Sequence, residues 1–284
     1  LQAYSNADDP DRVVGNDDMS ESPEGLALAD ALLKAKDMPA KKKVAAEWVL
    51  KHGKKTGKEH LVVLGKDGIP LAIMRGTKGN VSALPAVFRA GFDGAVTFSV
   101  HNHPSSSSLS GSDLAMAVLW KGHTLMVVPN NGTRPHEIRF VDAVDIAPDV
   151  RGRLQIQTHA ATFDAIAVAF TDARGAANAK LNWQANELGR GDPDGGAERF
   201  YRAERALFQL VLAKAGIIDY TDAKAHRQTV DAEGIDFEGI YGQISGNVAD
   251  RLRRAGLSVP ESGDSGGNRP ADGGADAAPP GTDG

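Results

Sequence analysis

The chain opens with two stretches in which apolar residues recur at helical spacing. Ser22-Pro23-Glu24 favours a helix start, because serine suits the cap position and proline suits the first turn. The apolar positions of this first helix are Leu26, Leu28, Ala29, Leu32 and Leu33. Met38-Pro39 ends it, and a second helix is expected from Ala40 to His52, closed by Gly53. The pattern therefore predicts a helical lead ahead of any strand.

From Glu59 onward the pattern changes to short runs rich in β-branched residues and leucine. His60–Gly65 and Ile69–Met74 read as two strands joined by a turn at Lys66-Asp67-Gly68. Further along, the sequence predicts a helix over 82–90, a strand over 94–100, a helix over 111–120, and a hairpin with strands at 124–128 and 136–141. Strands and helices that alternate in this way predict a mixed sheet flanked by helices, an α+β fold.

After about Ala147 the strand signals fade, and a mainly α-helical C-terminal region is expected. Residues 189–196 read as a loop, and helices are predicted over 197–215, near 221–230 and near 243–255. The predicted organisation has five parts: an acidic disordered lead at 1–21, a basic helical segment at 22–58, an α+β domain at 59–147, a mainly helical region at 148–258, and a disordered Gly/Pro/Asp-rich tail at 259–284.

The composition excludes several classes of protein. The 284 residues hold no apolar run near the roughly 20 that a membrane-spanning helix needs, so no membrane partner is expected. They hold no cysteine, which excludes a thiol nucleophile and a zinc site built on thiolates. The net charge of −5 conceals two acidic ends and nine lysines within residues 25–60. This lysine-rich segment lacks the interleaved aromatic residues of single-strand binders, which disfavours nucleic acid as a partner.

The residues best suited to chemistry follow the strand at 94–100. In extended chain, residues i and i+2 point to the same side, so His101 and His103 can direct two imidazoles to one point. Asp113 falls in the first turn of the next predicted helix, where the chain returns to the strand tip. Two histidines and a carboxylate form the kind of three-ligand set that catalytic zinc uses, with a fourth position left to water.

The order of these residues resembles a known family. A glutamate ahead of an early strand, then His-Asn-His-Pro at 101–104, then Ser-x-x-Asp at 110–113, is similar to the JAB/MPN (JAMM) zinc metallopeptidase domain. His-Asn-His-Pro-Ser is especially similar to the RadC-like bacterial branch and to JAB domains of phage proteins. The resemblance covers about residues 45–145, and it implies a JAB/MPN-like mixed sheet for the α+β domain.

The resemblance also implies a function, the zinc-dependent hydrolysis of amide or isopeptide bonds in a protein or peptide substrate. On this basis His101, His103 and Asp113 match the zinc ligands. Ser110 matches the serine whose hydroxyl helps hold the oxyanion of the tetrahedral intermediate. Glu59 matches the general base, which takes a proton from water and passes it to the leaving amine.

The sequence departs from the family at one point and offers alternatives at others. The family places seven residues between the second histidine and the serine, whereas this chain has six, 104–109. Glu47, within the second predicted helix, is the alternative to Glu59 as the base. His123 and His136 flank the second hairpin, and structural roles are expected for both. The letters His-Asn-His are not the HNH nuclease motif, whose three residues are spread along a ββα element.

Two further functions stay open at this point. A JAB fold without catalysis would serve as a scaffold in virion assembly, and RadC-like relatives suggest a DNA-processing accessory role. The chain begins with Leu1 rather than Met, and similar modules occur in phage head-morphogenesis proteins. We therefore expect a piece of a larger phage-encoded polypeptide, located in the bacterial cytoplasm or the virion, with phage structural proteins as possible partners.

Overall fold

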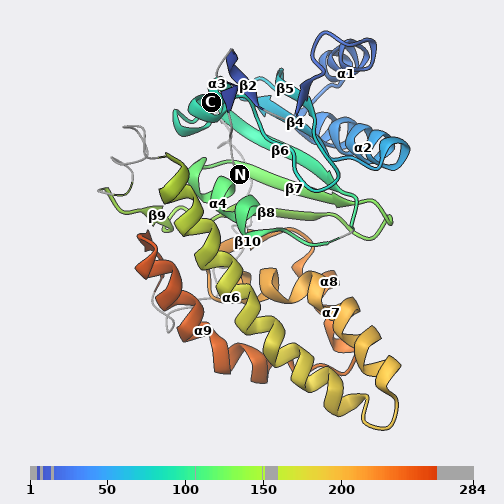
Figure 1. Ribbon diagram of the computed structural model, residues 1–284, viewed down its shortest axis with the longest axis vertical. Helices are drawn as coiled ribbons and strands as arrows, with labels where there is room; N and C mark the ends of the chain where they lie inside the picture. Colours follow the sequence, from blue (N-terminus) through green and yellow to red (C-terminus); the bar gives the residue numbers. More distant parts are fainter. Residues whose placement is uncertain are drawn as a thin grey trace, which may run out of the picture.

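The core of the fold is a seven-stranded mixed sheet with strand order β10-β8-β7-β6-β4-β5-β3 (Figure 1). The computed structural model describes residues 16–105, 107–148, 150 and 159–260, together with the backbone of two short strands at 5–6 and 9–13; the side chains of 159–162 are not described. The strands are β1 (Ser5–Asn6), β2 (Asp9–Val13), β3 (Asp17–Asp18), β4 (His60–Gly65), β5 (Pro70–Arg75), β6 (Val96–His103), β7 (Thr124–Pro129), β8 (His136–Phe140), β9 (Asp145–Ile146), β10 (Ile218–Tyr220) and β11 (Leu257–Ser258).

The helices are α1 (Pro23–Lys34), α2 (Met38–Thr56), α3 (Pro85–Phe92), α4 (Gly111–Leu119), α6 (His159–Leu188), α7 (Pro193–Lys214), α8 (Ala223–Ala232) and α9 (Phe237–Arg254). Within the main sheet β6 and β7 are parallel, and every other pairing is antiparallel. The parallel pair needs a crossover, and α4 supplies it between β6 and β7. This crossover places the N-terminus of α4 beside the end of β6.

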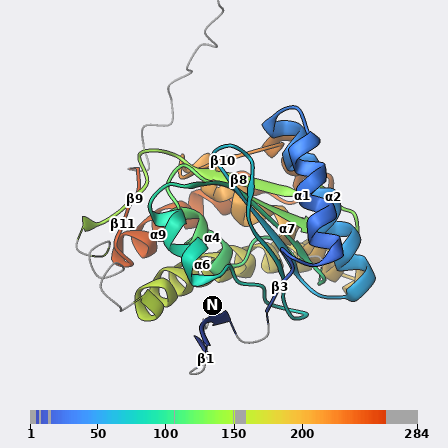
Figure 2. The same cartoon turned by 90° about the horizontal axis from the view of Figure 1, so that it is seen from above.

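Alternate side chains of each strand point to opposite faces of the sheet, so the hydrophobic core has two parts, one on each face. On one face α1 and α2 cover residues such as Val62, Phe98 and Val100, which are fully buried. On the other face, residues such as Val63, Leu125 and Val127 form one continuous core with α4 and the C-terminal helices. Figure 2 shows the sheet between α1 and α2 on one side and α4 and α6 on the other.

The second helix is longer than its pattern predicts at both ends. It begins at Met38, capped by the Asp37 carboxylate, with Pro39 in the first turn where its missing N–H is not needed. Gly53 does not close it, so that prediction is wrong. The helix continues to Thr56 and ends at Gly57, whose φ of 66° is the left-handed conformation that glycine adopts freely.

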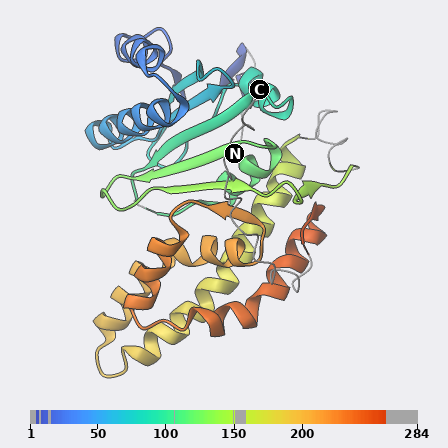
Figure 3. The same cartoon turned by 180° about the vertical axis from the view of Figure 1, so that it is seen from behind.

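Two strands of the main sheet come from segments in which no strand was predicted. Asp17–Asp18 forms β3 along β5 within the predicted acidic lead, and Ile218–Tyr220 forms β10 along β8 within the predicted helical region. The helical region thus shares a sheet as well as a core with the preceding domain. In Figure 3, α7 and α8 lie beyond the β10 edge, whereas the first part of α6 lies beside α4.

The predicted fold class is confirmed: the chain has an α+β fold with a mixed sheet flanked by helices and a helical C-terminal region. The predicted disordered tail lies outside the described residues from 261 onward, as do residues 1–4, 7–8 and 14–15 of the lead. Among the described helices, none combines the length and the apolar character needed to cross a membrane.

Candidate metal centre

The end of β6 and the start of α4 bring three potential metal ligands together. His101 and His103 lie two residues apart on β6 and are buried, with exposed fractions of 3% and 6%. Asp113 lies in the first turn of α4, which starts eight residues after β6 ends. The six residues between His103 and Ser110, one fewer than in the family pattern, are enough to return the chain to the strand tip.

The ligand atoms of this group face one another at short range. The Nε2 atoms of His101 and His103 are 2.9 Å apart. Oδ1 of Asp113 lies 3.1 Å from Nε2 of His101, and Oδ2 lies 3.5 Å from Nε2 of His103. One nitrogen or oxygen atom from each of the three residues lies within 4.8 Å of the others. Together these side chains can hold a metal ion.

The loop after β6 fixes the orientation of the His103 ring. Nδ1 lies 3.0 Å from the carbonyl oxygen of Ser107 and 3.1 Å from its hydroxyl. Because a carbonyl can only accept, Nδ1 carries a proton and donates it, so the ring offers the lone pair of Nε2 when it is neutral. A backbone carbonyl of this kind is a common outer partner of metal-binding histidines.

Ser110 holds the carboxylate of Asp113 through a reciprocal cap at the start of α4. Its N–H and its hydroxyl each donate to Oδ2 of Asp113 at 2.7 Å, while the hydroxyl accepts from the N–H of Asp113 at 3.1 Å. The same residues satisfy two helix-end N–H groups and orient a candidate ligand. The resemblance assigns the Ser110 hydroxyl to an oxyanion; in this structure the hydroxyl contacts Asp113.

Glu59 lies directly before β4, next to the three ligands. It is buried, with an exposed fraction of 8%. Burial raises the pKa of Glu59, partly offset by the nearby charges of His101 and His103. Leu61 of β4 is paired with His101 of the antiparallel β6, so Glu59, two residues before Leu61, lies level with His103 beside the candidate centre.

The same proximity sets the protonation of the ligands themselves. Burial would raise the pKa of Asp113, but the charge and hydrogen bond of His101, followed by those of His103, outweigh it and hold the pKa well below its ordinary value. Burial would lower the pKa of His103, but the hydrogen bond and charge of Asp113 raise it. Both shifts have the same cause, the attraction between the Asp113 carboxylate and the two imidazoles.

Asn102 braces the strand between the two histidines, a role that the sequence analysis did not assign. Its side chain points to the opposite face, where Oδ1 accepts from the N–H of His60 at 2.7 Å. Its Nδ2 donates to the carbonyl of Lys58 and to Oδ1 of Asn130, each at 3.0 Å. A polar residue inside a buried strand is the signal that could have identified it, since such a group needs partners.

The other titratable residues considered from the sequence lie elsewhere. Glu47 is exposed on α2, 3.9 Å from Lys43, and does not join the group. His60 packs its ring on the α2 side against Trp48, and burial lowers its pKa to about 4. His123 is bonded to the Ser99 hydroxyl at 2.7 Å within the core, as expected for a structural residue. His136 lines a cavity next to α7 and α8.

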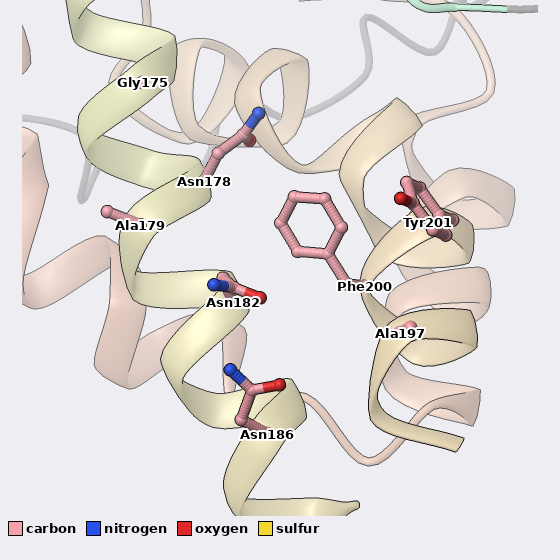
Figure 4. A pocket seen from close by; sticks show the side chains of 8 residues that line it. All are labelled: Gly175, Asn178, Ala179, Asn182, Asn186, Ala197, Phe200 and Tyr201. Carbon is pink, nitrogen blue, oxygen red and sulfur yellow. The ribbon is translucent and has the colours of Figure 1, made fainter. Parts of the chain in front are cut away.

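A separate cavity lies between α6 and α7, with a volume of about 390 Å³ (Figure 4). Three amide side chains spaced four residues apart, Asn178, Asn182 and Asn186, face Phe200 across it. Its lining among the described residues includes no carboxylate and no imidazole. The His101, His103 and Asp113 group therefore remains the best-supported site for metal chemistry.

No family model matches the chain, and no curated protein matches it significantly.

Proposed function

We propose that the chain is a zinc-dependent hydrolase of amide or isopeptide bonds, built on a JAB/MPN-like domain. The observation that carries the proposal is the convergence of His101, His103 and Asp113 beside the buried carboxylate of Glu59. Three ligands with room for a water molecule, and a fourth carboxylate outside the ligand set, are what metal-assisted hydrolysis requires.

The spacing of the ligands supports zinc. Two atoms bound to one tetrahedral zinc ion at about 2.0–2.1 Å lie about 3.3 Å apart. The separations of 2.9, 3.1 and 3.5 Å between the three pairs of facing atoms are close to that value. A set of two imidazoles and one carboxylate also suits ferrous iron. Elemental analysis of the purified protein distinguishes zinc from iron.

Each residue then has a defined task. When bound, zinc polarises the substrate carbonyl and brings the pKa of its water to about 7. Glu59 accepts a proton from the attacking water and returns it to the leaving amine, and its raised pKa brings it nearer to neutral pH, where a general base works best. The Ser107 carbonyl and Ser110 keep His103 and Asp113 oriented.

The first test measures the metal. Protein purified without added metal is expected to contain about one zinc ion per chain by elemental analysis, and His103→Ala is expected to lose it. His52→Ala on α2 is the matched control, since its ring stacks on Trp48 and lies outside the ligand group. A wild-type protein that binds no zinc, or that binds iron instead, would overturn the proposal.

The second test measures catalysis with a peptide and isopeptide library. Glu59→Gln is expected to keep the zinc and to lower cleavage by about 10²- to 10⁴-fold, the usual contribution of a general base. If zinc is bound and the variant cleaves as fast as the wild type, or the wild type cleaves nothing, the alternative of a non-catalytic JAB-fold scaffold is favoured instead.

A further inference from the structure

A second polar cavity lies where the turn between β7 and β8 meets α7 and α8, with a volume of about 460 Å³. In Figure 3 the light-green turn between β7 and β8 is at the left, on the same side of the molecule as the orange helices α7 and α8. The cavity is lined by three arginines and two histidines: Arg134 from the turn, Arg202 and Arg205 from α7, His136 from β8, and His226 from α8. No acidic residue is among its described lining residues.

The three arginines differ in how their charges are balanced. Arg202 pairs with Glu198 and Glu233, and Arg134 lies 4.0 Å from Asp222. Arg205 is half-buried and, within the part of the chain that the structure describes, makes no ion pair or hydrogen bond. Because the positive charge of Arg205 is not neutralised by an ion pair, it is available to an anion in the cavity.

His136 adds a directed hydrogen-bond donor to the same cavity. Its exposed fraction is 2%, and burial, followed by the charges of His226 and His103, lowers its pKa to about 3, so the ring is neutral. Nδ1 lies 2.7 Å from the hydroxyl of Tyr220, whose pKa burial raises, so the hydroxyl keeps its proton and can donate it. In the tautomer in which Nδ1 accepts from this hydroxyl, the ring proton is on Nε2, for which no hydrogen bond is formed among the described residues.

The helical region fixes this arrangement from the other side. His226 stacks on His136 with ring centroids 4.8 Å apart, and its Nε2 lies 3.2 Å from the carbonyl oxygen of Pro135. The carbonyl can only accept, so Nε2 of His226 donates to it and ties the turn to α8. These contacts hold α8 against the turn and β8 on one side of the cavity.

We propose that this cavity binds an oxyanion, the carboxylate or phosphate group of a small molecule or of a chain end. Arg205 supplies a guanidinium fork, which suits the two oxygens of either group, and His136 supplies a neutral donor. His136 is paired across the sheet with Val127, and Val127 with His101. The cavity thus adjoins the same sheet face as the metal centre, about two strand spacings or roughly 10 Å away.

The test is a calorimetric titration of the full chain with inorganic phosphate and, separately, with acetate, at constant ionic strength in a chloride buffer. At least one of the two anions is expected to bind saturably with one site per chain. Arg205→Gln is expected to weaken that binding about tenfold or more, as for a lost hydrogen bond to a charged group. This variant loses no described ion pair, so the fold is expected to persist.

Two control variants and one further variant of the cavity locate the binding site. Arg254→Gln removes the same charge from an exposed position on α9 and is expected to leave binding unchanged. Arg134→Gln, at an exposed position of the turn, is expected to weaken binding without affecting the fold. His103→Ala is expected to bind the anion as the wild type does, which excludes the metal centre as its location and separates this proposal from the proposed hydrolase activity.

The two anions distinguish the sources of the ligand. Tighter binding of phosphate indicates a phosphorylated ligand, and tighter binding of acetate indicates a carboxylate such as a chain end. If neither anion saturates the protein, or if Arg205→Gln binds the preferred anion as tightly as the wild type, the cavity is not an oxyanion site.

Discussion

The hydroxyl of Ser110 ties the helix cap to the candidate metal centre. It donates to Oδ2 of Asp113, and the N–H of the same serine donates to that oxygen too. Oδ1 is left facing His101 at 3.1 Å. The carboxylate is thereby held in one orientation without a metal. The conformational entropy of the Asp113 side chain is lost when α4 forms and not when a metal ion binds.

Replacing Ser110 by alanine tests this coupling. Ser110→Ala is expected to lower the metal affinity by about 10- to 100-fold, because it removes an outer partner of a ligand. It should also lower the free energy of unfolding by about 1 kcal/mol through loss of the cap. Metal affinity is measured by competition with a chromophoric chelator, and stability by urea denaturation.

Ser22→Ala is the matched control, because Ser22 caps α1 and accepts from the N–H of Gly25 at 3.0 Å without contacting a ligand. A similar loss of stability is expected with no change in metal affinity. If Ser110→Ala binds metal as tightly as the control does, the cap does not position Asp113.

At the scale of elements, local rules were sufficient to place the candidate ligands, although they were misapplied at the two ends of α2. The placement of His101 and His103 follows from strand geometry, and that of Asp113 from a cap three residues earlier. Features set by tertiary neighbours could not be predicted. The strand at 218–220 exists because β8 offers a free edge, and α2 passes through Gly53 because that face of the helix lies against Asn102.

At Gly53, where α2 contacts β6, close packing and helix propensity predict opposite effects of a substitution by alanine. A Cβ atom at this position would lie 2.2 Å from Nδ2 of Asn102, whose side chain is held by three hydrogen bonds. Gly53→Ala is therefore expected to lower the free energy of unfolding by about 1–3 kcal/mol, although alanine favours helices. Urea denaturation measures the change.

Gly246→Ala is the matched comparison, and we expect it to stabilise the protein. Gly246 lies inside α9, and a Cβ atom there would meet nothing within 4 Å. Its replacement is expected to raise the free energy of unfolding by up to about 1 kcal/mol, the propensity difference alone. Equal stabilisation by both substitutions would show that α2 does not pack closely on Asn102.

At the scale of the whole molecule, the helical region supports the candidate centre instead of standing apart from it. Nη1 of Arg174 on α6 donates to the carbonyl of Leu109, directly before Ser110, at 3.1 Å. A Cβ atom on Gly111 would lie 2.3 Å from the carbonyl oxygen of Ala167, so α4 and α6 approach closely at the start of α4. Together with β10, these contacts predict that sheet and helices unfold as one cooperative unit.

Phe170 tests this cooperativity, because it is a fully buried α6 residue that packs against Phe140 of β8. Phe170→Ala is expected to cost about 3–5 kcal/mol. Far-ultraviolet circular dichroism follows the helices. Tryptophan fluorescence, measured with Trp48 and Trp183 replaced by phenylalanine, reports on the core through Trp120, which is fully buried at the C-terminal cap of α4. Both probes are expected to shift together to a lower midpoint, whereas Tyr201→Ala, at a 65% exposed position on α7, should change stability by no more than about 0.5 kcal/mol. Two separate transitions, with only the circular dichroism signal displaced, would instead mean that the helices fold independently. The loop before α4 would then keep its geometry without the hydrogen bond from Arg174.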